Sequence, residues 1–201
     1  MLTVHHLDYS RSTRVVWLLE ELGEPYELVR YRRAVGGPAP AALALVHPLG
    51  KSPVLEDEGF VLAESSAILR YIDARYGGGR FTPEGATDRA RHDEWLDYVE
   101  GSLALPLFVP LVAGPGLPER MRTALSAQLD QAWRSIADTV AEGSFLLGDR
   151  LTLADMQIVY VLAVASATGA LANQPALESY FQRLLAHPAL QRAIAAGGPM
   201  A

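Results

Sequence analysis

The sequence predicts an α/β domain followed by an all-α domain, and a change of periodicity along the chain indicates this division. In residues 1–79, short strand-like runs alternate with two amphipathic helical patterns, whereas from residue 88 onward only helical patterns occur. Residues 80–87 follow consecutive glycines and include a proline, so we expect them to form a linker. The predicted domains are therefore 1–79 and 88–201.

Each element of the first domain has a local signal. Residues 2–7 and 26–31 have the composition of strands, and the apolar positions between them recur at the spacing of one helix face: Val15, Leu18, Leu19 and Leu22. Gly23 and Pro25 are expected to end this helix. A loop containing Gly36 and Pro38 follows the second strand.

The rest of this domain is predicted to be a hairpin and a second helix. Residues 53–56 and 60–62 flank Asp57-Glu58-Gly59, which has the length and chemistry of a hairpin turn. A helical stripe then runs from Ser65 to Tyr76. The predicted order is β-α-β, a loop, and β-β-α.

Long helical patterns fill the second domain. The first spans residue 88 to about residue 112, and we expect Pro106 and Pro110 to kink or end it. Its spacing places Trp95, Tyr98, Val99 and Ser102 on one face. Further helices are predicted around residues 125–140 and 177–184. Residues 153–164 are apolar nearly all round, as expected for a helix in the middle of a bundle.

Composition limits the function. The chain has 201 residues, 50% of them hydrophobic, which is enough for a folded core. It has no cysteine, which excludes a disulfide framework and a catalytic thiol of its own. A net charge of −6 argues against a nucleic-acid partner, and the histidines lack metal-binding spacing, so we predict no metal. The N-terminus lacks a basic leader and the longest apolar run, residues 158–165, is too short to span a membrane, so we expect a cytoplasmic protein without a membrane partner.

Hydroxyl groups precede both helices of the first domain, and each allows two interpretations. Ser10 or Ser12 could cap the first helix, or could donate to an anion at its positive end. Ser65 could likewise cap the second helix, or could bind a carboxylate while Glu64 binds an ammonium group. Pro53 opens a strand, where a proline cannot donate to the sheet, and we predict that the Ser52–Pro53 bond is cis.

Four segments together resemble the glutathione S-transferase family, especially its serine-type bacterial and fungal members. They are SRSTR with the following WLLEEL, HPLGKSPVL, ESSAI and FLLGDRLTLAD, which begin at residues 10, 47, 64 and 145. The resemblance implies a thioredoxin-like N-terminal domain that binds glutathione and a helical C-terminal domain. In the last segment, Thr152 and Asp155 have the spacing of a capping box, for which we predict a structural role.

The resemblance also implies an activity, the activation of the glutathione thiol for attack on a small hydrophobic electrophile. Ser10 matches the hydroxyl that contacts the thiolate, with Ser12 as the reserve, and strand alternation should turn Tyr9 away from Ser10. The residues expected to bind glutathione are Lys51, Ser52, Pro53, Val54, Glu64 and Ser65. An electrophile pocket is expected between the domains, lined by Tyr9, Tyr98, Leu105 and Phe108.

Several alternatives stay open at this point. The same site would serve a glutathione-dependent peroxidase or disulfide reductase, and the same fold could serve a non-catalytic binding protein. We expect a homodimer, in which an acidic residue of the partner's first C-terminal helix completes the site: Asp93, Asp97 or Glu100. Arg30-Tyr31-Arg32-Arg33 could attract anionic substrates, but a solvated strand end is the preferred interpretation.

Overall fold

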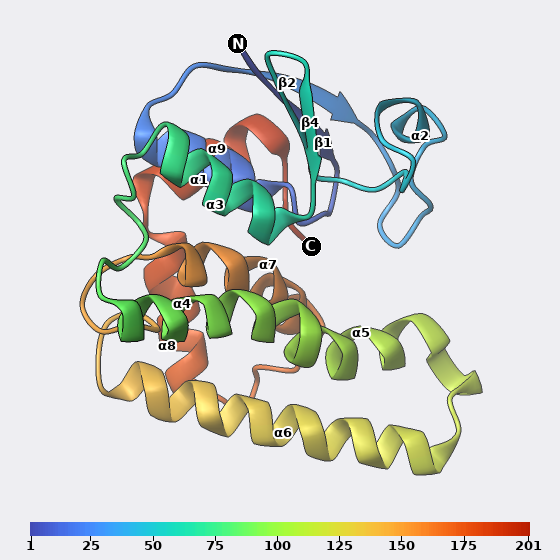
Figure 1. The fold of residues 1–201 in the computed structure, drawn as a ribbon. Coiled ribbons are helices and arrows are strands. Elements are labelled where there is room, and N and C mark those ends of the chain that lie inside the picture. The colour runs from blue at the N-terminus through green and yellow to red at the C-terminus, as the bar shows by residue number, and fades with distance from the viewer. The chain divides into compact units, whose positions relative to one another are not determined.

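The computed structural model describes all 201 residues, which divide into two compact units (Figure 1). The first unit comprises residues 1–83 and 183–201, and the second comprises residues 84–182. The division therefore falls inside the predicted linker, residues 80–87. The predicted all-α range 88–201 differs at its end, because the last helix packs against the first helix of the chain and joins the first unit.

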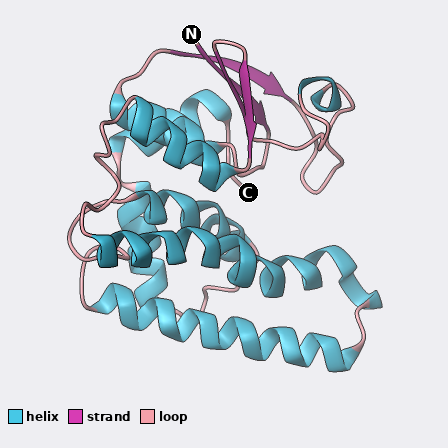
Figure 2. Cartoon of the chain, viewed as in Figure 1, coloured by secondary structure: helices cyan, strands magenta, loops and turns pink.

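The first unit contains the four-stranded sheet, and all four strands of the structure belong to this unit (Figure 2). Its strands are β1 (Leu2–Leu7), β2 (Tyr26–Tyr31), β3 (Val54–Asp57) and β4 (Phe60–Ala63), in the spatial order β2-β1-β3-β4. β1 and β2 are parallel, and the other pairs are antiparallel. The predicted hairpin is confirmed: Glu58 and Gly59 form its turn with φ values of 51° and 88°, the left-handed conformations that a two-residue turn requires.

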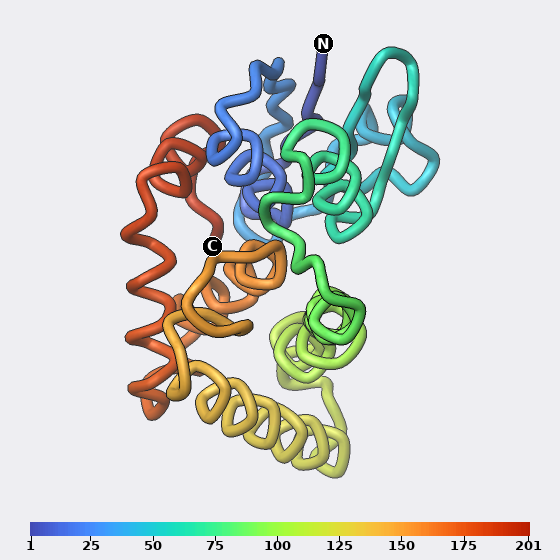
Figure 3. Tube along the Cα trace, turned by 60° about the vertical axis from the view of Figure 1, so that its left-hand side comes forward, coloured from blue at the N-terminus to red at the C-terminus, as the bar shows by residue number.

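Three helices accompany this sheet: α1 (Thr13–Leu22), α3 (Ser65–Arg75) and α9 (Pro188–Gly197). α1 packs against both α3 and α9, so its residues 13–19 are all buried and not only the predicted stripe. Figure 3 shows the C-terminal α9, in red, beside the blue α1. Gly23 ends α1 as predicted, with φ 69° and its N–H donating to the Leu19 carbonyl. The loop after β2 contains one short helix, α2 (Leu43–Val46).

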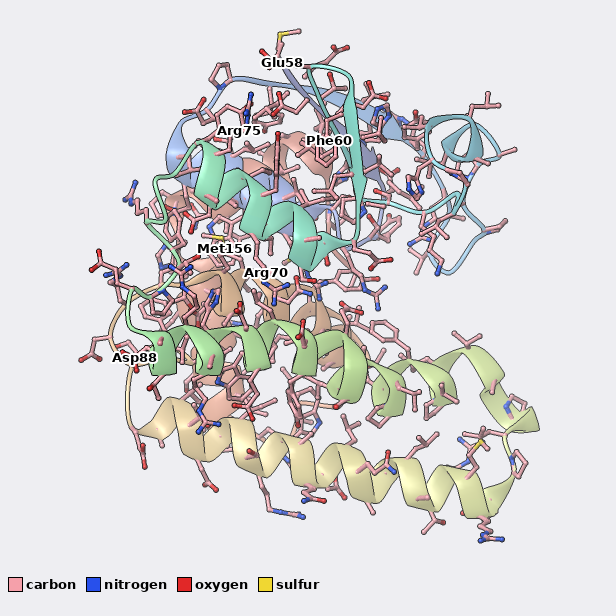
Figure 4. The ribbon with its side chains drawn as sticks, viewed as in Figure 1. Glu58, Phe60, Arg70, Arg75, Asp88 and Met156 are labelled. Carbon is pink, nitrogen blue, oxygen red and sulfur yellow. The ribbon has the colours of Figure 1, made fainter.

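A buried carboxylate joins the C-terminal end of α3 to the hairpin. Asp57 accepts hydrogen bonds from the hydroxyls of Tyr71 (2.7 Å) and Tyr76 (2.6 Å) and pairs with Arg75 at 3.0 Å. Burial would raise the pKa of Asp57, but these donors and the arginine charge outweigh it and lower the pKa. Arg75 also reaches Glu58 at the hairpin turn (Figure 4). This network therefore fixes the tip of the hairpin against the C-terminal end of α3. The other end of β4 leads directly into the start of α3.

The second unit is helical. It contains α4 (Ala86–Tyr98), the π-helical turn η1 (Val99–Leu103), α5 (Ala104–Ala113), the 3₁₀ turn η2 (Gly114–Gly116), α6 (Glu119–Ala141), α7 (Leu153–Ala167) and most of α8 (Pro175–Leu185). The sequence predicts that Pro106 kinks or ends the first helix, and the π turn η1 lies just before this proline. A proline lacks the N–H that would donate to the preceding turn, so the regular α-helical bonding is interrupted there. Neither proline ends the helix, which continues to Ala113.

The buried face of α4 and η1 differs from the predicted aromatic face. His92, Leu96, Val99 and Leu103 are buried, and α4 packs there against α7. Trp95 and Tyr98 are only half-buried and Ser102 is exposed. Of the four residues predicted to share one face, Val99 is buried as part of the core, and the other buried positions are His92, Leu96 and Leu103.

By length and composition, the helical run Ala86–Gly116 is the one that would pass for a membrane span. Of the most apolar 18 residues in this run, 33% lie buried inside the protein. Within the second unit its segments contact α6 and α7, which is the packing of a helix bundle.

α7 is buried on almost every side, and the predicted capping box at its start is confirmed. Asp155 accepts from the backbone N–H and the hydroxyl of Thr152, each at 2.9 Å. It also accepts from the Leu146 N–H (2.9 Å) and the Tyr180 hydroxyl (2.6 Å). Burial raises the pKa of this carboxyl, and the four donors oppose that rise. Asp155 thus connects α7 to the loop before it and to α8.

Candidate active site

The turn between β1 and α1 contains Tyr9 in a left-handed conformation, with φ 55°. Because β1 ends at Leu7, strand alternation does not decide where Tyr9 points, and that argument was wrong. Arg33 donates to the Tyr9 carbonyl and to the Asp8 carbonyl, and Arg30 pairs with the Asp8 carboxylate at 2.7 Å. The basic run Arg30–Arg33 at the end of β2 therefore stabilises this turn and is more than a solvated strand end.

The two serines of the turn do not cap α1 with their side chains. Ser12 occupies the N-cap position, but its hydroxyl makes no capping bond; it lies 2.9 Å from His6 Nδ1 and 2.7 Å from the Ser10 hydroxyl. Ser12 is fully buried, whereas Ser10 is 5% exposed. A ligand that approaches the turn therefore meets Ser10 before Ser12.

Ser65 is likewise not a capping residue. The N-cap of α3 is Glu64, an exposed residue with φ 72°, and its side chain makes no capping bond. Ser65 is buried, and its hydroxyl accepts from Nη1 of Arg14 at 3.0 Å. Arg14 is fully buried on α1. This contact brings the first turn of α1 to the start of α3, so the SRSTR and ESSAI segments meet in one place.

Pro53 immediately precedes β3, and the Ser52–Pro53 bond is cis, as predicted. The register places Val54 opposite Ala63, the residue before Glu64. The Ser52 hydroxyl accepts from the Leu7 N–H (3.0 Å) and donates to the His5 carbonyl (2.8 Å), so its side chain holds the end of β1. The Lys51 side chain is exposed.

The predicted electrophile residues of the second unit do not line one cavity. Tyr98 and Leu105 line a groove of about 550 Å³ that faces α6. Phe108 is not among the residues of this groove, and its ring stacks on that of Tyr160, with centroids 5.9 Å apart. The two side chains that do share a groove therefore point to α6, a direction that helical spacing alone does not reveal.

Two important residues were missed in the sequence, Arg14 and His6. Arg14 has a detectable signal, because it lies four residues before Leu18 on a buried face of α1, where an arginine needs a partner. His6 has no such signal, since Gly197, one of its partners, is distant in the sequence. The structure shows no group of three or more histidine, aspartate or glutamate side chains placed to hold a metal ion.

Comparison with known proteins gives the family. The profile of the glutathione S-transferase N-terminal domain matches residues 2–74, and that of the C-terminal domain matches residues 119–196. Glutathione S-transferase 3 of Schizosaccharomyces pombe is 32% identical over 182 residues, which cover 82% of this chain and 74% of the relative.

Two solved structures agree with this. A glutathione S-transferase from Actinobacillus pleuropneumoniae has a TM-score of 0.91 and 33% identity, with coverage of 99% of this chain and 94% of the other. A sphingomonad glutathione S-transferase complexed with glutathione has a TM-score of 0.79 and 25% identity, with 98% of each chain covered. The fold and the enzyme class predicted from the sequence are confirmed, and the chain belongs to the glutathione S-transferase family.

Proposed function

We propose that the protein binds glutathione in its first unit and activates the thiol for attack on a small hydrophobic electrophile. The observation that carries this proposal is the contact of Arg14 with Ser65, which joins the turn of Ser10 to the start of α3. A hydroxyl for the sulfur and a helix N-terminus for a carboxylate then belong to one site. The glutathione bound in the sphingomonad relative supports the choice of ligand.

The first unit offers a binding group for each part of the glutathione tripeptide. The exposed Glu64 carboxylate binds the γ-glutamyl ammonium, and Ser65 with the first amides of α3 binds the adjacent carboxylate. The backbone of Val54, placed by Pro53, pairs with the cysteinyl residue, and Lys51 reaches the glycyl carboxylate. Ser52 acts by holding β1 beside this strand.

Ser10 activates the glutathione thiol by stabilising its thiolate form. A free thiol has a pKa of about 8.5, and only the thiolate is an effective nucleophile. Each unit by which the site lowers that pKa requires about 1.4 kcal/mol of preference for the thiolate. A hydrogen bond to a charged group contributes about 1.5–3 kcal/mol, so one hydroxyl donor is sufficient for a shift of one to two units.

The Ser10→Ala variant tests this role. We expect the pKa of bound glutathione to rise by about one unit or more towards that of the free thiol, because the donor to the thiolate is lost, while affinity changes less. The measurement is the thiolate absorbance of the complex as a function of pH. A wild-type thiol pKa that Ser10→Ala leaves unchanged would contradict the assignment of Ser10.

Calorimetric titration with glutathione, followed by a substrate panel, tests the function itself. Saturable binding and conjugation of an aryl halide are expected. Turnover of an organic hydroperoxide or a mixed disulfide alone would assign a peroxidase or reductase instead. Absence of glutathione binding would contradict the proposal. The role of Tyr9, Tyr98, Leu105 and Phe108 at the electrophile stays a prediction that the panel, repeated on alanine variants, will test.

We also expect a homodimer. The hairpin exposes apolar surface at Phe60 (49% exposed) and Val61 (39% exposed), which association would cover. Light scattering at micromolar concentration should give twice the monomer mass of 21.7 kDa. A monomer mass would contradict both the dimer and the prediction that Asp93, Asp97 or Glu100 completes the partner's site.

A further inference from the structure

A chain of hydrogen bonds leads from Ser10 into the interior of the first unit. The Ser10 and Ser12 hydroxyl oxygens are 2.7 Å apart, and the Ser12 oxygen lies 2.9 Å from Nδ1 of His6. The other ring nitrogen, Nε2, lies 3.0 Å from the carbonyl oxygen of Gly197, the last residue of α9. His6 is 1% exposed and Ser12 is fully buried, so no part of this chain beyond Ser10 meets solvent.

The last acceptor determines the direction of every bond in this chain. A carbonyl oxygen can only accept, so Nε2 of His6 carries a hydrogen. A neutral imidazole has one such hydrogen, so Nδ1 accepts from the Ser12 hydroxyl. Ser12 uses its hydrogen in this 2.9 Å bond rather than in the longer 3.4 Å approach to the Leu7 carbonyl, so Ser10 donates to Ser12. In the free protein the Ser10 hydrogen is therefore engaged. One lone pair of the Ser10 oxygen accepts from the Ser12 N–H at 3.3 Å, and the other can accept from a ligand.

The imidazole is neutral in this state. Burial lowers the pKa of His6, and the positive charge of Arg30 on β2 lowers it further. The bond to the Gly197 carbonyl and the negative charge of Asp8 act in the opposite direction. Because Arg30 and Asp8 pair with each other at 2.7 Å, their effects on the ring partly cancel.

The position of the ring is fixed by close packing as well as by hydrogen bonds. A Cβ atom on Gly197 would lie 2.5 Å from Cε1 and 2.9 Å from Nε2 of His6, closer than real Cβ contacts. Gly197 is not among the residues with left-handed backbone, so its own conformation does not require glycine. Contact with the imidazole is therefore the reason for glycine at this point of α9.

We propose that His6 receives the proton of the glutathione thiol through Ser10 and Ser12. This inference rests on the proposed function. In the step, the S–H bond breaks and its proton passes to the Ser10 oxygen. The Ser10 hydrogen passes to Ser12, and the Ser12 hydrogen passes to Nδ1 of His6. The products are a thiolate and an imidazolium, and no proton enters solvent.

The product state leaves every group in the chain with a partner. Nε2 of His6 still donates to the Gly197 carbonyl, and Nδ1 now donates to Ser12, which donates to Ser10. Ser10 then donates to the thiolate, which is the contact the proposed function requires. The imidazolium lies at the C-terminal end of α9, where a helix stabilises positive charge, and the thiolate formed in the same step adds a negative charge that opposes the lowering of the His6 pKa by burial. His6 is a positioning residue, since it touches neither the sulfur nor the electrophile.

The wild-type protein tests this directly through a count of protons. Glutathione is titrated calorimetrically near neutral pH in buffers of different ionisation enthalpy, which gives the protons released, and absorbance gives the thiolate formed. We expect fewer than half a proton released for each thiolate formed. One proton released per thiolate would overturn the relay and leave the proposed function intact. Absence of binding or of thiolate would overturn both.

Two variants separate the relay from a structural role. His6→Asn places an amide oxygen near the position of Nδ1 and so keeps an acceptor for Ser12, but it cannot take up a proton. Ser12→Ala breaks the relay in the middle. In both we expect about tenfold less bound thiolate at neutral pH, and in His6→Asn one proton released per thiolate. The double variant should be no worse than either single one.

His5→Asn is the matched control. His5 is also buried and is the neighbour of His6 on β1, but its ring lies 3.0 Å from the Tyr31 hydroxyl and 3.1 Å from the Glu56 carboxylate, and only its backbone carbonyl contacts a serine, Ser52. It should leave the thiol pKa and the proton count unchanged, even if it lowers stability. Equal shifts in His5→Asn and His6→Asn would assign the effect to the strand and overturn the relay.

Discussion

The Asp155→Ala variant is expected to lose about 3–5 kcal/mol of unfolding free energy, the largest stability effect of any substitution proposed for this protein. The carboxylate accepts four hydrogen bonds, two from backbone N–H groups and two from hydroxyls. Alanine leaves the N–H groups of Leu146 and Thr152 without this acceptor. Both residues are buried, so an unsatisfied N–H group there costs free energy. The start of α7, the preceding loop and α8 lose their common contact.

Chemical denaturation followed by tryptophan fluorescence measures this effect. Trp95 and Trp133 report on the second unit and Trp17 on the first, so a variant that retains only one of these tryptophans shows which unit has been destabilised. Asp149→Ala is the control, because Asp149 is exposed and its contacts with Ser144 are 3.4 Å long. We expect it to lie within about 0.5 kcal/mol of wild type. A similar small loss for Asp155→Ala would contradict the structural role.

The combined change Glu64→Gln and Ser65→Ala is expected to weaken glutathione binding by about 100-fold, with little change in the pKa of the bound thiol. It removes one charge and one hydroxyl from the γ-glutamyl end, which act equally in the ground state and the transition state. The loss corresponds to about 3 kcal/mol, a reasonable sum for two contacts with charged groups. Ser10→Ala should show the reverse pattern, a raised pKa with affinity changed less.

Calorimetry and the thiolate titration measure the two effects separately. Ser66→Ala, in the same first turn of α3, is the control and should bind as wild type does, because Ser66 is only half-buried and its side chain does not hold another element in place. Ser65 also accepts from the buried Arg14, so the melting temperature of each variant must accompany its affinity. An affinity within threefold of wild type would contradict the placement of the γ-glutamyl end at Glu64.

Local signals were sufficient for much of the first unit. The strands at residues 2–7 and 26–31 and the helix ended by Gly23 lie where they were predicted, because strand composition and a left-handed helix end depend on neighbouring residues. The hairpin turn at Glu58 and Gly59 and the capping box of Thr152 are of the same kind. Each of these features is determined within a few residues of chain.

Helix faces and side-chain partners were predicted less well. Spacing placed Trp95 and Tyr98 on one face of α4, but the residues of α4 that are buried are His92 and Leu96, in a helix that packs against α7. Ser12 and Ser65 are of a residue type that commonly caps helices, yet the Ser12 hydroxyl bonds to His6, and Ser65, the first residue of α3, accepts from Arg14. A cap and a tertiary contact compete for the same hydroxyl, and the choice depends on what lies opposite it in the fold.

The sequence by itself determined the family, the mixed and helical parts of the chain, and the segments that carry the candidate site. Only the tertiary structure brought Arg14 to Ser65, placed the last helix on the first, and set Gly197 against His6. The reason is the separation along the chain: His6 and Gly197 are 191 positions apart, and no periodicity spans that distance. The contact of His6 with the Gly197 carbonyl decides which group donates in each hydrogen bond between His6 and Ser10. Only the folded position of α9 places that carbonyl beside the ring.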